Sequence, residues 1–160
     1  MLNDDYKDIL LALSERRVKF LLVGAYAMAA HGYPRSTMDI DLWIMPDPNN
    51  ALLVLQALKD FGAPCGDLSA EDLQKDDMIF QIGVAPRRID ILTSADGLKF
   101  EDSFINSDKI EIEGIPVHVL SVSDLIKNKR STGRLKDLAD AESLAGYPDS
   151  NEGTRSRCGF

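Results

Sequence analysis

The chain has 160 residues, of which 44% are hydrophobic and 28% charged, and its 18 basic and 26 acidic side chains give a formal charge of −8. This composition is typical of a globular domain and excludes a disordered chain. The negative charge excludes general coating of nucleic acid or anionic lipid, although a local basic patch could still bind one nucleotide or one RNA end.

The N-terminus and the cysteines indicate where the protein works. Residues 1–6 are acidic, whereas a signal peptide begins with positive charge, and the longest apolar run, residues 20–30, is too short to cross a bilayer. The two cysteines, Cys65 and Cys158, lack the spacing of metal ligands, which indicates a reducing compartment. We therefore expect a cytoplasmic protein with no membrane partner.

Hydrophobic spacing in the first half of the chain predicts alternating helices and strands. The expected helices span residues 2–17, 25–31 and 51–61, and the expected strands span residues 20–23 and 38–44. On the third helix, Leu52, Leu55 and Leu58 recur on one face and are expected to be core residues. Ser69 and Asp72 stand three apart and predict a capping box at the start of a helical turn.

The second half predicts more strands followed by helices. Residues 78–84 and 88–93 read as a hairpin, residues 111–112 and 116–120 as a second strand pair, and 121–129 and 132–145 as helices. We expect an α/β (α+β) fold with a mixed sheet flanked by helices and a small C-terminal helical part. One domain over 1–146, with its core at about 18–120 and its C-terminal helices at about 121–146, would precede a flexible tail over 147–160.

Asp39 and Asp41 are the strongest chemical signal in the sequence. They lie two apart on an expected strand, so both carboxylates leave one face while apolar side chains occupy the other. Two like charges there favour a cation between them, and carboxylate oxygens suit Mg²⁺ or Mn²⁺. Asp90 stands in the middle of a second apolar strand, and a neighbouring position would bring three carboxylates together. Either motif alone has a plainer interpretation: a solvated strand edge for the pair, and an ion pair with Arg87 or Arg88 for Asp90.

Two further segments are candidates for phosphate binding. Gly24 separates a strand from a helix, and its missing side chain would let a phosphate approach the backbone N–H groups there, although a tight turn explains it equally. Residues 124–136 hold five basic side chains against one acidic one. They predict either a cationic wall for a triphosphate or RNA phosphate, or a solvated helix end.

These residues together resemble the DNA polymerase β-like nucleotidyltransferase superfamily, and more closely its minimal bacterial branch that includes AbiEii-type toxins. The family pattern is a strand, then Gly-Gly or Gly-Ser opening a helix, then Asp-x-Asp on the next strand and a third acid on a later one. Here the matching segments are residues 23–25, 35–41 and 89–91. Residues 125–129 and 134–140 resemble the Lys and Lys-Asp-x-x-Asp elements of the AbiEii-like group.

The resemblance implies a nucleotidyltransferase fold and the transfer of a nucleoside monophosphate from an NTP to a hydroxyl acceptor, such as tRNA or a protein. A cognate partner protein in a toxin–antitoxin pair is implied as well. Asp39, Asp41 and Asp90 would be the catalytic and metal-binding residues, with Mg²⁺ or Mn²⁺ as cofactor. The implied nucleotide-binding residues are Gly24, Ala25, Arg35, Thr37, Lys127, Lys129 and Lys136.

Ala25 departs from the family pattern, because it stands where the family has a second Gly or a Ser. Its backbone N–H remains but a hydroxyl donor is missing, which leaves open a second hypothesis: a catalytically weak protein of this fold that acts as a binding partner. A third hypothesis is a nucleotide-sugar glycosyltransferase that uses Asp39 and Asp41 as its Asp-x-Asp motif, although 160 residues is short for that class.

Overall fold

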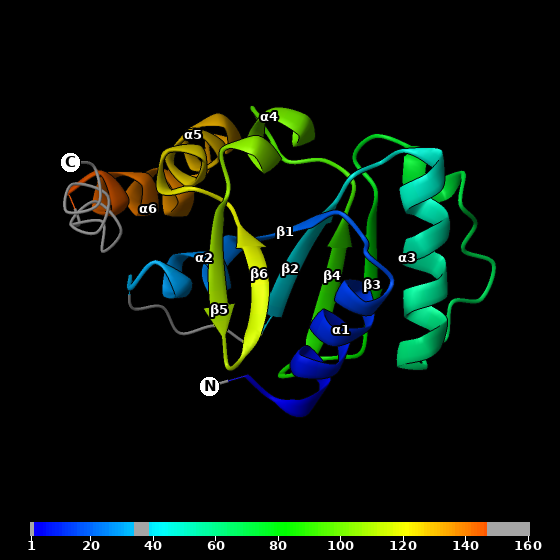
Figure 1. Cartoon of the computed structure of the whole chain (residues 1–160). Coiled ribbons are helices and arrows are strands. Elements are labelled where there is room, and N and C mark those ends of the chain that lie inside the picture. The colour runs from blue at the N-terminus through cyan, green and yellow to red at the C-terminus, as the bar shows by residue number, and fades with distance from the viewer. Residues whose placement is uncertain (1, 34–38, 147–160) are drawn as a thin grey trace.

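A single six-stranded sheet organises the protein in the computed structural model, which describes residues 2–33 and 39–146 (Figure 1). The strands are β1 (Phe20–Val23), β2 (Asp39–Ile44), β3 (Ile79–Ile82), β4 (Arg88–Leu92), β5 (Asp108–Ile112) and β6 (Ile115–Val119). The helices are α1 (Asp4–Glu15), α2 (Gly24–Ala30), α3 (Pro48–Phe61), α4 (Phe100–Ile105), α5 (Val122–Thr132) and α6 (Leu135–Gly146), with a 3-10 turn η1 (Asp72–Gln74). The expected α/β class with a mixed sheet flanked by helices is therefore confirmed.

The order of strands in the sheet is β3-β4-β2-β1-β6-β5. β2 is antiparallel to β1 but parallel to β4, and β1 is parallel to β6. The expected hairpins stand at the two edges of the sheet, β3 with β4 at one edge and β5 with β6 at the other. This order makes β2 and β4, which are far apart in the chain, direct neighbours in the interior of the sheet.

The two faces of β2 differ in character. Ile40, Leu42 and Ile44 are fully buried in the hydrophobic core, which also includes the apolar faces of α1 and α3. Those two helices pack against each other; in Figure 1 α1 lies in front of the sheet and α3 stands to its right, next to β3. The alternate residues Asp39 and Asp41 leave the opposite face and are only half-buried. The core thus holds the strand rigidly from one side and leaves its carboxylates accessible on the other.

Several local expectations are confirmed and others are wrong. Ser69 and Asp72 form the predicted capping box, each side chain accepting the other's backbone N–H. Leu52, expected in the core, is 52% exposed. Leu58 is fully buried, as expected. Helix α3 begins at Pro48, capped by Asp47, and the rest of its buried face is formed by Asn50, Ala51, Val54 and Ala57.

The C-terminal helices also differ from expectation. Helix α4 has no counterpart among the predicted elements, although its Phe100 is buried and meets Trp43 edge-on, with 5.2 Å between ring centroids. Thr132, expected to begin the last helix, ends α5 instead, and Gly133 follows with a left-handed φ of 71°. The expected tail over 147–160 lies outside the described residues.

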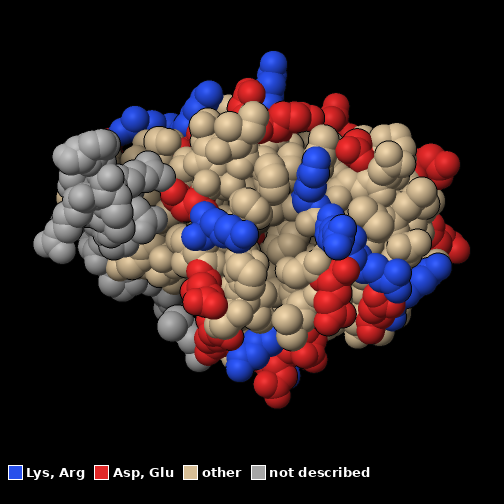
Figure 2. All heavy atoms as spheres, in the orientation of Figure 1, with Lys and Arg blue, Asp and Glu red and all other residues tan. Residues whose placement is uncertain are grey.

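Charge is mixed over the face of the protein shown in Figure 2. Basic and acidic side chains alternate there, and the described residues form no broad basic area in this view. This agrees with the net charge of −8. Within the described ranges, no helix combines the length and the apolar character that crossing a bilayer requires.

Candidate active site

Three carboxylates meet on one face of the sheet because of the register between β2 and β4. Asp41 pairs with Asp90, and Asp39 pairs with Arg88. Residues two apart on a strand share a face, so these four side chains form a compact patch of three acids and one base. The sequence predicted the convergence of the acids, but the parallel pairing that produces it is a property of the folded sheet.

Arg88 is bound directly to two of the three acids. Its Nη2 donates to Asp39 Oδ2 at 2.8 Å and to Asp90 Oδ2 at 3.3 Å, and its Nε lies 3.2 Å from Asp90 Oδ1. Asp90 is the most deeply placed of the group, with a side chain 9% exposed. An ion pair with a neighbouring arginine was the alternative to metal binding for Asp90, and this structure contains that ion pair at the centre of the acidic patch.

Asp41 has the most strongly altered ionisation. Burial, and after it the charge and hydrogen bonding of Asp90 and the charge of Asp39, together raise the pKa of its carboxyl from 3.8 to about 6, while Arg88 opposes them. A carboxylate in this environment gains from a nearby cation, because positive charge relieves both the desolvation and the repulsion. Strongly perturbed acids of this kind are concentrated at functional sites.

Gly24 makes room for Asp41. It begins α2 with a φ of +68°, and a Cβ at this position would overlap Asp41 Oδ2. The sequence suggested that Gly24 admits phosphate; the structure adds that its missing side chain also seats the second carboxylate. Ala25 follows it in a helix of only seven residues.

Replacing Gly24 by alanine is therefore expected to disturb the site as well as the backbone. The left-handed φ costs an L-residue roughly 1–2 kcal/mol, and the new methyl group must also displace the Asp41 carboxylate. The matched control is Gly62→Ala, since Gly62 has a φ of +88° with nothing within 4 Å of the place that an added methyl group would take. Chemical unfolding should show a similar backbone cost in both variants, and only Gly24→Ala should lose nucleotide-dependent activity. Equal activity in the two variants would contradict this role.

A cavity of about 600 Å³ opens over the acidic patch. Asp39, Asp41 and Asp90 line it from the sheet, and residues of α5, α6 and the turn between them form another wall. Lys129 and Lys136 are among those wall residues, together with Asn128, Thr132, Arg134 and Asp137. Cationic and acidic groups therefore line the same cavity, which is large enough for a small ligand.

Lys129 is already neutralised by acidic neighbours. Its Nζ lies 3.1 Å from Asp137 and 3.3 Å from Asp140, and all three side chains are largely buried. Burial tends to raise the pKa of Asp137, but hydrogen bonds from Thr132 and Lys129 hold it below the ordinary value. Lys136 is exposed on the same wall and is the better placed of the two lysines to meet a solvent-borne anion.

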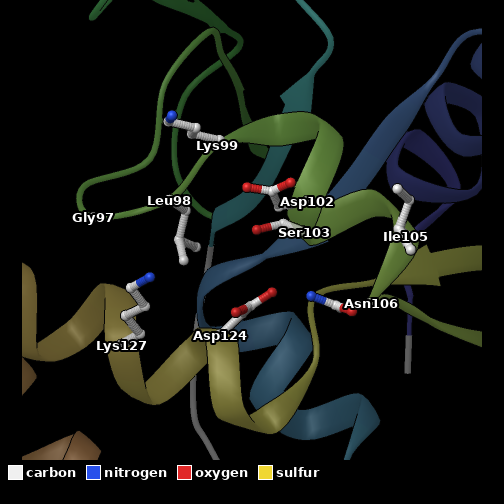
Figure 3. Close-up of a pocket in the computed structure, with 9 residues that line it drawn as sticks. All are labelled: Gly97, Leu98, Lys99, Asp102, Ser103, Ile105, Asn106, Asp124 and Lys127. Carbon is white, nitrogen blue, oxygen red and sulfur yellow. The ribbon is translucent and has the colours of Figure 1, made fainter.

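Lys127 lies in a different cavity, of about 450 Å³, between α4 and the start of α5. Figure 3 shows Lys127 and Asp124 projecting from α5 toward Leu98 and Ser103. Residues 94–96 line the acidic cavity, whereas residues 97–99 line this one, so the connecting loop separates Lys127 from the three acids. Two other candidate residues, Arg35 and Thr37, lie outside the described residues.

The donor set suits a divalent cation such as Mg²⁺ or Mn²⁺. Three carboxylates offer oxygen ligands on one face, and Asp90 Oδ1 is buried and accepts no hydrogen bond, although it lies near Arg88 Nε. Among the described residues, no three acidic, histidine or cysteine groups are already arranged around one point as ligands. The residues therefore fit the ion chemically, while Arg88 occupies the centre of the patch.

Comparison with known proteins defines the class. A family model described as "Nucleotidyl transferase of unknown function (DUF2204)" matches residues 2–154, so the chain belongs to this nucleotidyl transferase family. No curated protein matches the sequence. The AbiEii branch expected from the sequence is not among these findings.

Solved structures share the fold. TM1012 of Thermotoga maritima, a candidate nucleotidyltransferase, is 18% identical, with a TM-score of 0.56 over 91% of this chain and 93% of that one. The antibiotic-resistance factor ANT(2'')-Ia is also 18% identical, with a TM-score of 0.56 over 88% of this chain and 80% of that one. A second structure of ANT(2'')-Ia, in complex with adenylyl-2''-tobramycin, is 17% identical over 88% and 84% of the two chains, with a TM-score of 0.56.

Proposed function

We propose that this protein is a metal-dependent nucleotidyltransferase that moves a nucleoside monophosphate from an NTP to a hydroxyl acceptor. The observation that carries the proposal is the patch of Asp39, Asp41 and Asp90, joined by strand register and open to one cavity. The family match favours this reaction over the glycosyltransferase considered from the Asp-x-Asp motif. The structural neighbour with an adenylyl-tobramycin ligand supports a nucleotidyl group passing to an acceptor molecule.

Each residue of the site has a role in this reaction. Asp39 and Asp41 would hold Mg²⁺ or Mn²⁺, and the bound ion would supply positive charge that offsets the triphosphate. The acceptor oxygen forms a bond to the α-phosphorus while the bond to pyrophosphate breaks in line with it. Asp90 would complete the metal site, and it would orient the acceptor hydroxyl and receive its proton. Lys136, which lines the same cavity, would offset the charge of the leaving pyrophosphate, and Gly24 leaves room for the Asp41 carboxylate.

The proposal also extends to the class of acceptor and to the biological setting. A tRNA end or a partner protein, within a toxin–antitoxin pair in the cytoplasm, is the acceptor class that the sequence resemblance suggests. The acidic overall charge favours an acceptor held at the cavity over one bound along an extended basic surface. A purely binding function remains the second candidate, because Ala25 replaces a hydroxyl or glycine of the family pattern.

Calorimetry with each of the four NTPs tests the proposal. In the presence of Mg²⁺ one NTP should bind, and EDTA should abolish the heat. Asp39→Asn should weaken that binding roughly 100-fold or more, because one charged metal ligand becomes neutral. Asp60→Asn is the control, since Asp60 pairs with Arg16 on the surface. A folded sample that binds none of the four NTPs would contradict the proposal and favour the binding-partner function.

A further inference from the structure

Arg88 lies within the acidic patch at the position that a bound metal ion would be expected to take. Its guanidinium contacts both oxygens of Asp90 and one oxygen of Asp39, at distances from 2.8 to 3.3 Å. The register of β2 and β4 sets it directly opposite Asp39, two residues along the strand from the Asp41–Asp90 pair. A planar guanidinium presents several donors in a fixed fork, so it can join two carboxylates that would otherwise repel each other.

We propose that Arg88 is a built-in counter-cation that holds the site together without metal and that a divalent ion binds by displacing it. This inference rests on the proposed metal-dependent function. Arg88 occupies one oxygen of Asp39 and both oxygens of Asp90, so a metal ion that used these two carboxylates would compete with it, and two cations at close range there repel each other. The arginine therefore lowers the affinity for free metal while it stabilises the metal-free fold.

The surroundings of Arg88 permit the displacement. Its side chain is 36% exposed, whereas that of Asp90 is 9% exposed, so the arginine is the member of the pair that has room to move. Arg88 also lines the cavity shared with the three acids. Once released from Asp39, its charge stays on the wall where an anionic triphosphate would lie. Metal is thus expected to bind weakly alone and more tightly together with nucleotide, because the phosphates become the new partner of Arg88.

Mn²⁺ binding and metal-free unfolding of three variants test this exchange. Arg88→Gln should unfold at a lower temperature than wild type in EDTA, and its affinity for Mn²⁺ without nucleotide should rise about tenfold or more. Arg88→Lys should fall between the two, since one ammonium cannot join both acids as the fork does. Arg87→Gln is the matched control, because the neighbouring Arg87 pairs with Asp5 on the surface instead.

The outcomes separate the inference from the proposed function. The wild type could bind Mn²⁺ while both Arg88 variants bind it with equal or lower affinity. That result would overturn the counter-cation role and leave the metal-dependent function standing. Absence of Mn²⁺ binding in the wild type and in Arg88→Gln would overturn both. A higher Mn²⁺ affinity in Arg88→Gln, combined with a lower metal-free unfolding temperature and unaltered behaviour of Arg87→Gln, would support the exchange.

Discussion

Asp41→Asn is expected to reduce nucleotidyl transfer roughly 1,000-fold or more, because the substitution removes a charged ligand from the proposed metal site. The same variant is expected to be more stable than the wild type in the absence of metal. Asp41 is the carboxyl whose pKa burial and the charges of Asp90 and Asp39 raise to about 6. An amide of the same shape carries no charge, so it removes this repulsion and the desolvation cost of the ionised group.

The sign of the pH dependence follows from the direction of the pKa shift. The folded-state pKa of Asp41 lies above its ordinary value of 3.8, so the folded protein holds the proton more tightly than the unfolded chain does. The favourable contribution of the protonated group is complete below pH 3.8 and is lost as the pH rises through about 6. At pH 8 the asparagine variant should therefore gain on the order of 2–3 kcal/mol in free energy of unfolding, and at pH 4 the difference should nearly vanish.

Urea unfolding in EDTA at pH 4 and pH 8 measures this difference. Asp60→Asn provides a control of opposite sign, because hydrogen bonding to Arg16 lowers the pKa of Asp60 and its charge is favourable in the folded state. An Asp41→Asn variant less stable than the wild type at pH 8 would contradict the electrostatic account of the site. Gain of stability with loss of activity would identify Asp41 as a residue placed for function at the expense of stability.

Lys129→Met is expected to destabilise the protein by about 3 kcal/mol, because it removes the buried cation that Asp137 and Asp140 share, although Arg134 still lies 2.9 Å from Asp137. The Nζ atom of Lys129 lies 3.1 and 3.3 Å from the two carboxylates, and its side chain is only 14% exposed. These ion pairs link α5 to α6, so their loss should loosen the wall of the cavity. Any loss of nucleotide binding in this variant would then follow from the loss of structure.

Arg130→Met on the same helix is the matched control. Arg130 lies 3.9 Å from Glu142, and both side chains are mostly exposed, so its removal should cost no more than about 0.5 kcal/mol. Urea unfolding at pH 7.5 compares the two variants, and nucleotide binding is measured where both are folded. The two variants could instead have equal free energies of unfolding while only Lys129→Met loses nucleotide binding. Lys129 would then be a direct ligand of the phosphates.

Much of the fold could be predicted from local signals. The strand over 20–23, the hairpin of β3 and β4, and the capping box of Ser69 and Asp72 all follow from alternation or from turn and cap residues that act over a few positions. Errors arose where local and tertiary information diverge. Leu58 is buried as expected, but Leu52, which has helical spacing with it, is exposed because the core lies on the side of Val54 and Ala57. Helix α4 is too short to show a periodic pattern in the sequence. In the structure its Phe100 packs against Trp43.

The sequence by itself determined the class of fold and pointed to the three acids, because an acid within an apolar strand is unusual wherever it occurs, and it pointed to the glycine before α2 by its place between a strand and a helix. Only the tertiary structure decided what surrounds them. Strand register set Arg88 opposite Asp39, and the α5–α6 contact neutralised Lys129. A loop separates Lys127 from the acidic cavity. Spacing along a chain reveals which side chains share a face, but the partner of a charge depends on which distant strand or helix packs beside it.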